Sequence, residues 1–377
     1  MNKFFKTAFL GIMTLAAFEG KAQNDKNPRS IKPVIDIDAT EVKSQDRTGT
    51  CWSFATTSFI ESELIRMGKG AHNISEMYNV RNVYPKKAEV YVRNHGKAQF
   101  GEGSLAHDVI NSVREYGMVP ESVYTGLKFD NRYNHAEMSN ILKKILQGVV
   151  ENKGRTLSKK WKEAYNAVLD VYMGSAPETF EYEGKMYTPK SFADMLGMNP
   201  DDYITVTSFT HQPYYSQFIL QVPDNFSDGM FYNLPLDEYM EVIDHALKNG
   251  YTLSLDADVS EKGFSSKHGL AIVPTEYKGK DAFFKENVSE VSVTSESRQE
   301  AYDNYQTTDD HLMHITGTGK DKYGNKYFKV KNSWGSNGLG FGGNIYMSDS
   351  YMRLKSISVL LHKDALPKNV KKKLGVK

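Results

Sequence analysis

The chain has 377 residues and a net charge of +1, from 47 Lys and Arg against 46 Asp and Glu. Its 23 Tyr and 19 Phe can fill a large core, which excludes a disordered or collagen-like chain. The single cysteine, Cys51, excludes an internal disulfide framework and any CxxC-type zinc or redox site, and the balanced charge gives no argument for a nucleic-acid or anionic-membrane partner.

The first residues predict a targeting segment. A short basic stretch precedes an apolar run of 11 residues, 8–18, which is too short to cross a bilayer. Gly20 and Ala22 occupy positions −3 and −1 of a small-residue cleavage site. We therefore expect a signal peptide over 1–22, an extended lead-in over 23–44, and an exported product, periplasmic or secreted, without a stable membrane anchor. A buried N-terminal helix is the alternative.

Hydrophobic periodicity predicts helices first and strands later. Helical spacing or composition marks 51–67, 104–116, 135–173 and 236–249. Strand-like segments are 203–209, 252–255, 312–317, 327–331 and 344–347. This order predicts an α+β fold of two lobes. The expected parts are a helical lobe over 45–250 with an insertion at about 125–235, a β-rich lobe over 251–365, and a basic, solvated C-terminal tail over 366–377.

Cys51 has neighbours that suit a nucleophile. It begins its predicted helix directly after the loop 47–50, where the helix dipole and the free backbone N–H groups favour thiolate over thiol. Gln45 lies six residues upstream, and its amide can donate to an oxyanion beside the Cys51 backbone N–H. By itself, this pattern also fits a cysteine at a helix start that has no chemistry.

A nucleophilic cysteine needs a base, and the base needs an orienting partner. His268, His311 and His314 are the candidate bases in the C-terminal half. Asn332 follows a predicted strand, and its amide oxygen can hold an imidazole in place. Trp334 can shield that hydrogen bond from water, which strengthens it.

Three separated motifs resemble those of the papain-like cysteine peptidases, in the family's order. They are QDRTGTCWSFA from Gln45, HLMHITG from His311 and VKNSWG from Val330. The segments GEGS at 101–104 and YGMVP at 116–120 are similar to the branch that contains bleomycin hydrolase and aminopeptidase C, and so is the segment 236–259.

The resemblance implies a papain-like fold, with a helical lobe that bears Cys51 facing a barrel-like β-rich lobe that bears His311 and Asn332. It implies that peptides bind between the lobes and are cleaved through a thioester acyl-enzyme, without a cofactor or metal. The Gln45 amide and the Cys51 N–H would form the oxyanion hole. The other implied site residues are Trp52, Trp334 and Gly335, which support the triad, and Gly101, Glu102, Gly103 and Ser104, which line the cleft.

Two histidines compete for the role of base. His311 and His314 are three residues apart, so on a strand they face opposite sides. The family's spacing from histidine to glycine selects His311, six residues before Gly317. His268 lacks a following Asn-Ser-Trp motif, and a metal site made by Asp309 with its histidine neighbours lacks the H-E-x-x-H pattern.

The branch within the family decides where a peptide is cut. Only 44 residues precede Gln45, there is no second cysteine, and the insertion at about 125–235 is long, which favours the aminopeptidase C branch. The resemblance to that branch also implies a homo-oligomer. That branch restricts cleavage through a C-terminal arm, which the basic tail 366–377 does not resemble. An unrestricted papain-like endopeptidase and an inactive papain-fold binding protein therefore stay open. Asn332 argues against an amide hydrolase or transglutaminase-like enzyme, whose third residue is usually Asp.

Overall fold

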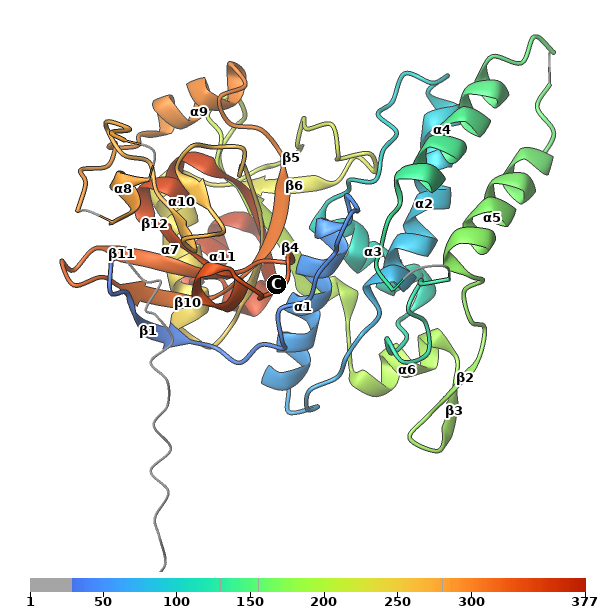
Figure 1. The fold of residues 1–377 in the computed structure, drawn as a ribbon, viewed down its shortest axis with the longest axis horizontal. Helices are drawn as coiled ribbons and strands as arrows, with labels where there is room; N and C mark the ends of the chain where they lie inside the picture. The colour runs from blue at the N-terminus through green and yellow to red at the C-terminus, as the bar shows by residue number, and fades with distance from the viewer. Residues whose placement is uncertain (1–28, 129–130, 155, 280, 286) are drawn as a thin grey trace, which may run out of the picture.

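The computed structural model describes residues 29–128, 131–154, 156–279, 281–285 and 287–377. A lobe of helices and a lobe built around one large sheet lie side by side (Figure 1). The predicted α+β class with two lobes is thereby confirmed. The predicted signal peptide, 1–22, lies outside the described residues.

The helical lobe surrounds one buried helix. Its elements are α1 (Cys51–Arg66), α2 (Glu76–Arg93), α3 (Ala106–Tyr116), α4 (Ala136–Val150), α5 (Lys160–Met173), the hairpin β2 (Phe180–Tyr182) and β3 (Lys185–Tyr187), and α6 (Pro189–Leu196). All residues of α1 from Cys51 to Leu64 are buried, because α2 and α3 pack on one side of α1 and the sheet of the other lobe packs on the opposite side. We did not predict α2, which has Pro85 in its interior, where proline normally breaks a helix.

One sheet organises the β-rich lobe. Its strands are β1 (Lys32–Asp36), β4 (Tyr203–Thr207), β5 (Gln217–Ile219), β6 (Met230–Asn233), β7 (Leu253–Ala257), β8 (Phe264–Ser265), β9 (Leu270–Ala271), β10 (His311–Lys320), β11 (Lys326–Lys331), β12 (Asn344–Ser348) and β13 (Ser356–His362). The order is β5-β6-β4-β13-β7-β10-β11-β12-β9-β8, with β1 added along β10. The helices of this lobe are α7 (Leu236–Lys248), α8 (Ala282–Lys285), α9 (Ser295–Asp303), α10 (Asp349–Lys355) and α11 (Lys368–Leu374).

The boundary between the lobes lies earlier in the chain than we predicted. Strands β4, β5 and β6 belong to the large sheet, and α7 packs into the core of the same lobe. The β-rich lobe therefore begins near residue 200 and not at 251. These strands have three to five residues, and β4 pairs with β13 from the far end of the chain. Such short segments carry too little alternation to reveal a distant partner.

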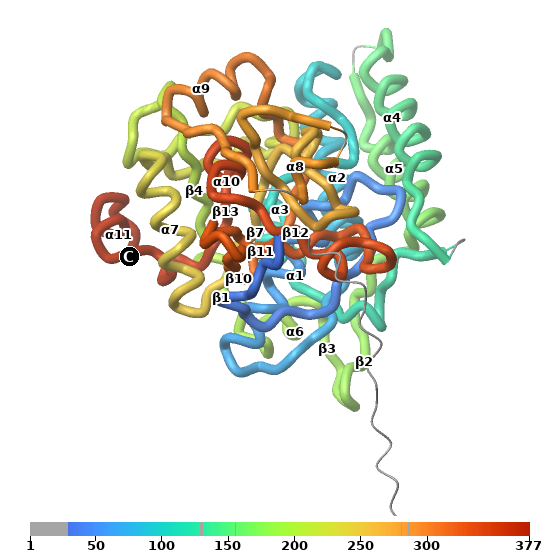
Figure 2. The backbone as a smooth tube through the Cα atoms, turned by 60° about the vertical axis from the view of Figure 1, so that its left-hand side comes forward, coloured from blue at the N-terminus to red at the C-terminus, as the bar shows by residue number. Residues whose placement is uncertain are grey.

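The C-terminal segment is a docked helix, which corrects the expectation of a solvated tail. Val370 and Leu374 of α11 are buried in the core of the β-rich lobe, and Lys373 forms a 2.7 Å ion pair with Glu238 of α7. In Figure 2, α11 lies at the outer edge of this lobe, on the side away from α2 and α4. Among the helices that the structure describes, none is both long and apolar enough to cross a bilayer.

Gly317 allows β1 to approach β10. A Cβ atom at this position would lie 2.1 Å from the carbonyl oxygen of Ile35, a backbone atom that cannot move away independently. We expect Gly317→Ala to lower the free energy of unfolding by about 1–3 kcal/mol, because β1 must shift or detach. Denaturant unfolding measures this. Gly148→Ala in α4 is the control, since its Cβ would enter open space and alanine favours a helix; an equal loss in both variants would contradict the explanation.

Candidate active site

Cys51 is the first residue of α1, at the end of the helix that points into the junction between the lobes. Its side chain is 8% exposed, and the backbone N–H of Leu312, the second residue of β10, faces its sulfur. Two buried hydrogen bonds fix α1 against the sheet: Thr56 Oγ1 to Ser254 Oγ at 3.0 Å and Ser58 Oγ to His314 Nδ1 at 2.9 Å. The nucleophile predicted from the sequence therefore lies beside the strand that begins with His311.

His311 is held by Asn332. The distance from His311 Nε2 to Asn332 Oδ1 is 2.7 Å, and the backbone N–H of Ser333 donates to the same oxygen at 2.7 Å. Because the Ser333 N–H can only donate, the atom that accepts from it is the amide oxygen, and Nε2 must carry the imidazole proton. Nδ1 is then free to accept the thiol proton. The ring of Trp334 lies 4.8 Å from that of His311 and covers this hydrogen bond on the solvent side, with 39% of its own surface exposed.

Gln45 connects the cysteine loop to the asparagine loop. Its backbone N–H donates to the carbonyl of Ser333 at 2.9 Å, and its Oε1 accepts from Ser333 Oγ at 2.6 Å. One N–H of its amide donates to the carbonyl of Thr48 at 2.6 Å, which leaves the other, within the described part of the chain, for an oxyanion. Sequence reasoning missed Ser333, although it lies inside the NSW motif; it positions Gln45 from the opposite lobe.

His314 faces away from this group. It is buried against α1, where Ser58 Oγ accepts from Lys331 Nζ at 2.8 Å and bonds the imidazole at 2.9 Å. His268 bonds Ser265 at 2.9 Å and stacks on Phe284. The structure thus brings His311, and neither of the other two candidates, to Asn332.

Known proteins with similar sequences and folds identify the family of this chain. The model of the peptidase C1-like family matches residues 97–377. The chain belongs to this family. It is similar to aminopeptidase C of Lactobacillus helveticus (24% identity over 93% of this chain and 86% of the relative) and to aminopeptidase G of Lactobacillus delbrueckii subsp. lactis (24%, over 95% and 90%). The crystal structure of PepW from Lactobacillus rhamnosis HN001 superposes with a TM-score of 0.73, at 20% identity, over 92% of this chain and 85% of that one.

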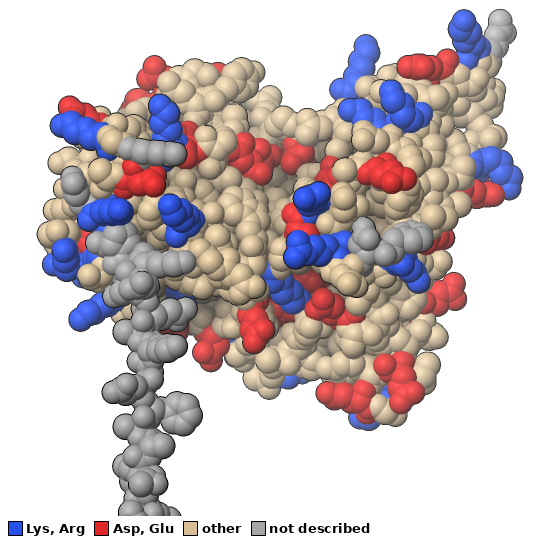
Figure 3. Space-filling view, viewed as in Figure 1, with Lys and Arg blue, Asp and Glu red and all other residues tan. Residues whose placement is uncertain are grey.

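The predicted papain-like fold is confirmed by these matches, and the protein is a papain-like cysteine peptidase that acts on peptides. Its lobes meet at a hollow in the molecular surface, at the top of Figure 3. The first turn of α1 rises toward this hollow (Figure 1). The peptidase thus presents Cys51 from one lobe and His311 from the other.

The predicted cleft residues 101–104 support the site more than they line it. The carboxylate of Glu102 accepts from the backbone N–H of Gly49 and from Ser139 Oγ, both at 2.6 Å, and its carbonyl accepts from Trp52 Nε1 at 2.9 Å. Glu102 therefore fixes the loop that precedes Cys51. Ser104 Oγ turns inward to Asp108 at 2.6 Å.

Gly101 and Gly103 contribute backbone only. The carbonyl of Gly103 accepts from the buried ammonium of Lys87. Gly335 has a φ of 75°, in the left-handed region that glycine adopts without strain, and its N–H donates to the carbonyl of Lys43 at 3.0 Å. Its position closes the asparagine loop against the lead-in segment.

Burial controls the charges of Cys51 and His311, the pair predicted to be catalytic. Burial raises the pKa of Cys51 to about 12; the Leu312 N–H opposes this, and the charges of Asp224, Asp309 and Asp256 add to it. Burial lowers the pKa of His311 to about 4, which its bond to Asn332 opposes. Each group alone therefore rests uncharged at neutral pH. This differs from the thiolate expected at a helix start, because the loss of hydration exceeds the effect of the helix terminus.

Replacing Asn332 tests its role in holding the base. We expect Asn332→Ala to lower kcat/KM roughly 10- to 100-fold, the usual effect of losing a hydrogen bond to a charged group. The bond stabilises imidazolium, so its loss lowers the pKa of His311 further and moves the acid limb of the kcat/KM profile to lower pH. Steady-state rates across the acid range measure both effects. An unchanged acid limb would show that Asn332 does not act on the imidazole.

Proposed function

We propose that this protein is an exported cysteine aminopeptidase that removes residues from the free amino ends of peptides. The observation that carries the chemistry is the group formed by Cys51 at the start of α1, His311 at the start of β10, and Asn332, whose oxygen lies 2.7 Å from His311 Nε2. The names of the similar proteins, aminopeptidases C and G, support the restriction to amino ends.

In the proposed reaction, the sulfur of Cys51 attacks the carbonyl carbon of the first peptide bond as its proton passes to Nδ1 of His311. The Gln45 amide and the Cys51 N–H stabilise the oxyanion. Imidazolium then gives its proton to the leaving amine, which departs and leaves a thioester on Cys51. Imidazole next takes a proton from water, the hydroxide attacks the thioester, and the proton returns to sulfur as the amino acid is released.

The loop between β5 and β6, residues 220–229, supports an exopeptidase because it joins the two lobes beside the site. Its Asp224 accepts from Gln99 Nε2 at 3.0 Å, and its Ser227 lies 2.8 Å from His107 Nε2. The ammonium of Lys87 lies 5.2 Å from the ring centre of Phe226 in the loop. A loop that bridges the lobes in this way would limit how many substrate residues fit on one side of the cleaved bond.

Product mapping tests this function against its alternatives. One peptide is supplied with a free and with an acetylated amino end, and the products are identified by mass spectrometry. An aminopeptidase releases single residues from the free form and loses at least ~100-fold in rate on the acetylated form, whereas retained internal cleavage would establish an endopeptidase. If a thiol-directed epoxide leaves Cys51 unlabelled and neither peptide is cleaved, the protein is an inactive papain-fold binding protein.

Export has its own test. We propose that residues 1–22 are removed as a signal peptide. Expression of the full chain in a Gram-negative host, followed by mass spectrometry of the amino end, should give a product that begins at Gln23 in the periplasm or the medium. A cytoplasmic product that retains residue 1 would overturn the proposal.

A further inference from the structure

Three carboxyl groups meet beside the nucleophile, and we call them the acid pocket: Asp224 on the β5–β6 loop, Asp256 on β7, and Asp309 just before β10. The charges of all three raise the pKa of Cys51. Asp256 is also paired across the sheet with Leu312, the residue whose N–H faces Cys51. This pairing places the acid pocket next to Leu312 and hence close to Cys51.

The carboxyl groups of the acid pocket are short of donors. Asp256 is 2% exposed, and neither of its oxygens has a hydrogen-bond partner among the residues that the structure describes; the same holds for Asp309 Oδ2. Asp256 and Asp309 face each other, and the backbone N–H of Asp224 faces the carboxylate of Asp309. Two facing carboxyl groups require a proton or a cation between them.

The described protein does not supply that cation by direct contact. Lys87 is the nearby buried ammonium, but it donates to the carbonyl of Gly103, and no carboxylate in the described part of the chain lies within 4.0 Å of its Nζ. A shared proton would satisfy one oxygen of the facing pair and leave the other acceptors open. No three acidic, histidine or cysteine side chains within the described ranges converge closely enough to hold a metal ion.

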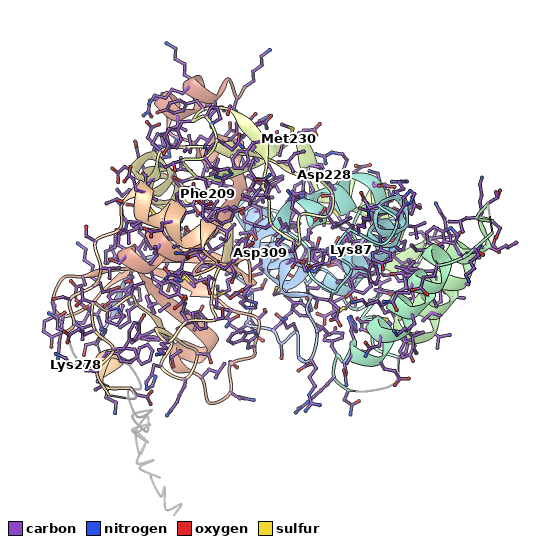
Figure 4. The ribbon with its side chains drawn as sticks, turned by 90° about the horizontal axis from the view of Figure 1, so that it is seen from above. Lys87, Phe209, Asp228, Met230, Lys278 and Asp309 are labelled. Atoms are coloured by element: carbon purple, nitrogen blue, oxygen red, sulfur yellow. The ribbon has the colours of Figure 1, made fainter. Side chains whose placement is uncertain are left out.

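Part of the acid pocket is exposed at the junction between the lobes. Asp224 and Asp309 are each only partly buried. Seen from above, Asp309 and Lys87 lie on the two sides of the junction, with Asp228 on the loop nearby (Figure 4). Asp224 lies directly against Gly103, where a Cβ would be 1.9 Å from its Oδ2, so only glycine admits the carboxylate there. The unpartnered oxygens of Asp256 and Asp309 Oδ2 are themselves buried, so an external cation would meet the acid pocket at the exposed parts of Asp224 and Asp309.

We propose that Asp309 and Asp224, supported by Asp256, bind the α-ammonium group of the substrate peptide and thereby select free amino ends. An ammonium has three N–H donors, which suit two carboxylates on the exposed side of the acid pocket, and its charge offsets that of the buried Asp256 behind them. The inference rests on the proposed aminopeptidase function and names its recognition site. The C-terminal helix α11, docked on α7, is then not needed for this recognition.

Binding would also act on the nucleophile. The carboxylates of the acid pocket oppose formation of a thiolate on Cys51. A bound ammonium offsets their negative charge. A substrate with a free amino end would therefore make it easier for Cys51 to lose its proton and attack. Removal of one carboxylate should therefore impair recognition of the amine and yet increase the reactivity of the thiol in the free enzyme, two effects of opposite sign.

The test compares Asp309→Asn with Asp228→Asn in the full chain. Asp228 is an exposed acid on the β5–β6 loop with a φ of 56°, which asparagine also adopts, so its replacement makes the same charge change outside the pocket. Rates are measured on an aminoacyl coumarin amide with a free amine and on its N-acetyl form. We expect Asp309→Asn to lower kcat/KM for the free amine roughly 10- to 100-fold, chiefly by raising KM. The ratio of kcat/KM for the free amine to that for the acetylated form should fall by the same factor. Asp228→Asn should stay within about twofold of the unmodified enzyme.

Alkylation of Cys51 by iodoacetamide, without substrate, distinguishes a loss of amine binding from a general disruption of the site. Asp309→Asn should react faster than the unmodified enzyme at the same pH. Slower alkylation, or an unchanged preference for the free amine, would overturn the inference. If the unmodified enzyme itself shows no such preference, the proposed function fails instead. Asp224→Asn, on a loop at the surface, gives the same comparison should Asp309→Asn fold poorly.

Discussion

Replacement of Cys51 by alanine is expected to abolish peptide hydrolysis while leaving the fold in place. Without the sulfur no thioester forms, and loss of a covalent nucleophile typically costs at least ~10⁴-fold in kcat. The side chain is buried, but the replacement removes a single sulfur atom, so the loss of packing should be small. Hydrolysis of an aminoacyl coumarin amide measures the rate, and circular dichroism with a thermal scan checks the fold.

Two controls make this result specific. Because Cys51 is the single cysteine of the chain, alkylation of the unmodified enzyme by iodoacetamide should add one label and remove activity in parallel. Cys51→Ser keeps a small polar group at the helix start but is a far weaker nucleophile, so it should be nearly as inactive as the alanine variant. Substantial activity in either variant would show that another residue attacks the substrate.

The elements that carry Cys51, His311 and Asn332 could be predicted from the sequence because their signals are local. The helix that begins at Cys51, the loop that carries Gln45, and the strand that ends before Asn332 each lie within a few residues of the side chain they position. His311 was separated from His314 by spacing alone, and the sheet does place them on different faces: His314 is bonded to Ser58 of α1, and His311 to Asn332.

The three carboxyl groups of the acid pocket could not be predicted, because their meeting depends on contacts between distant segments. Asp224, Asp256 and Asp309 come from a loop, a strand and a connection, and nothing in their local sequences indicates that they meet. Helix α2, which carries Lys87, has Pro85 in its interior and was not predicted. Strand β4 was expected as the segment 203–209, but its pairing with β13 was not, and β5 and β6 have only three and four residues, too few to show a periodic pattern. The β-rich lobe was therefore drawn about 50 residues too short.

The contacts between lobes explain why the catalytic groups depend on the whole fold. Ser333, after β11, bonds the backbone and the side chain of Gln45, which precedes α1. Glu102, from the helical lobe, fixes the Gly49 N–H in the same loop. The oxyanion donors are thus held from both sides, so a shift of one lobe against the other would move the oxyanion hole along with the base.

The second large effect is expected at His311. Replacing it by glutamine removes the group that takes the thiol proton and gives it to the leaving amine. Loss of a general acid–base typically lowers the rate 10²- to 10⁴-fold, and we expect a loss of roughly 10³-fold in kcat. The glutamine amide can still bond Asn332, so the loop 332–335 should keep its place. Steady-state rates measure the loss, and iodoacetamide should alkylate Cys51 more slowly at neutral pH, because no base assists removal of its proton.

His314→Gln is the matched control, because it makes the same replacement on the same strand three residues away. His314 is buried and bonded to Ser58, so this variant should unfold at lower temperature yet keep its activity within about fivefold. If His314→Gln proved as inactive as His311→Gln while still folded, the base could not be assigned by the contact with Asn332. If instead only His311→Gln loses activity, His311 at the start of β10 transfers the protons, and His314 holds α1 to the sheet.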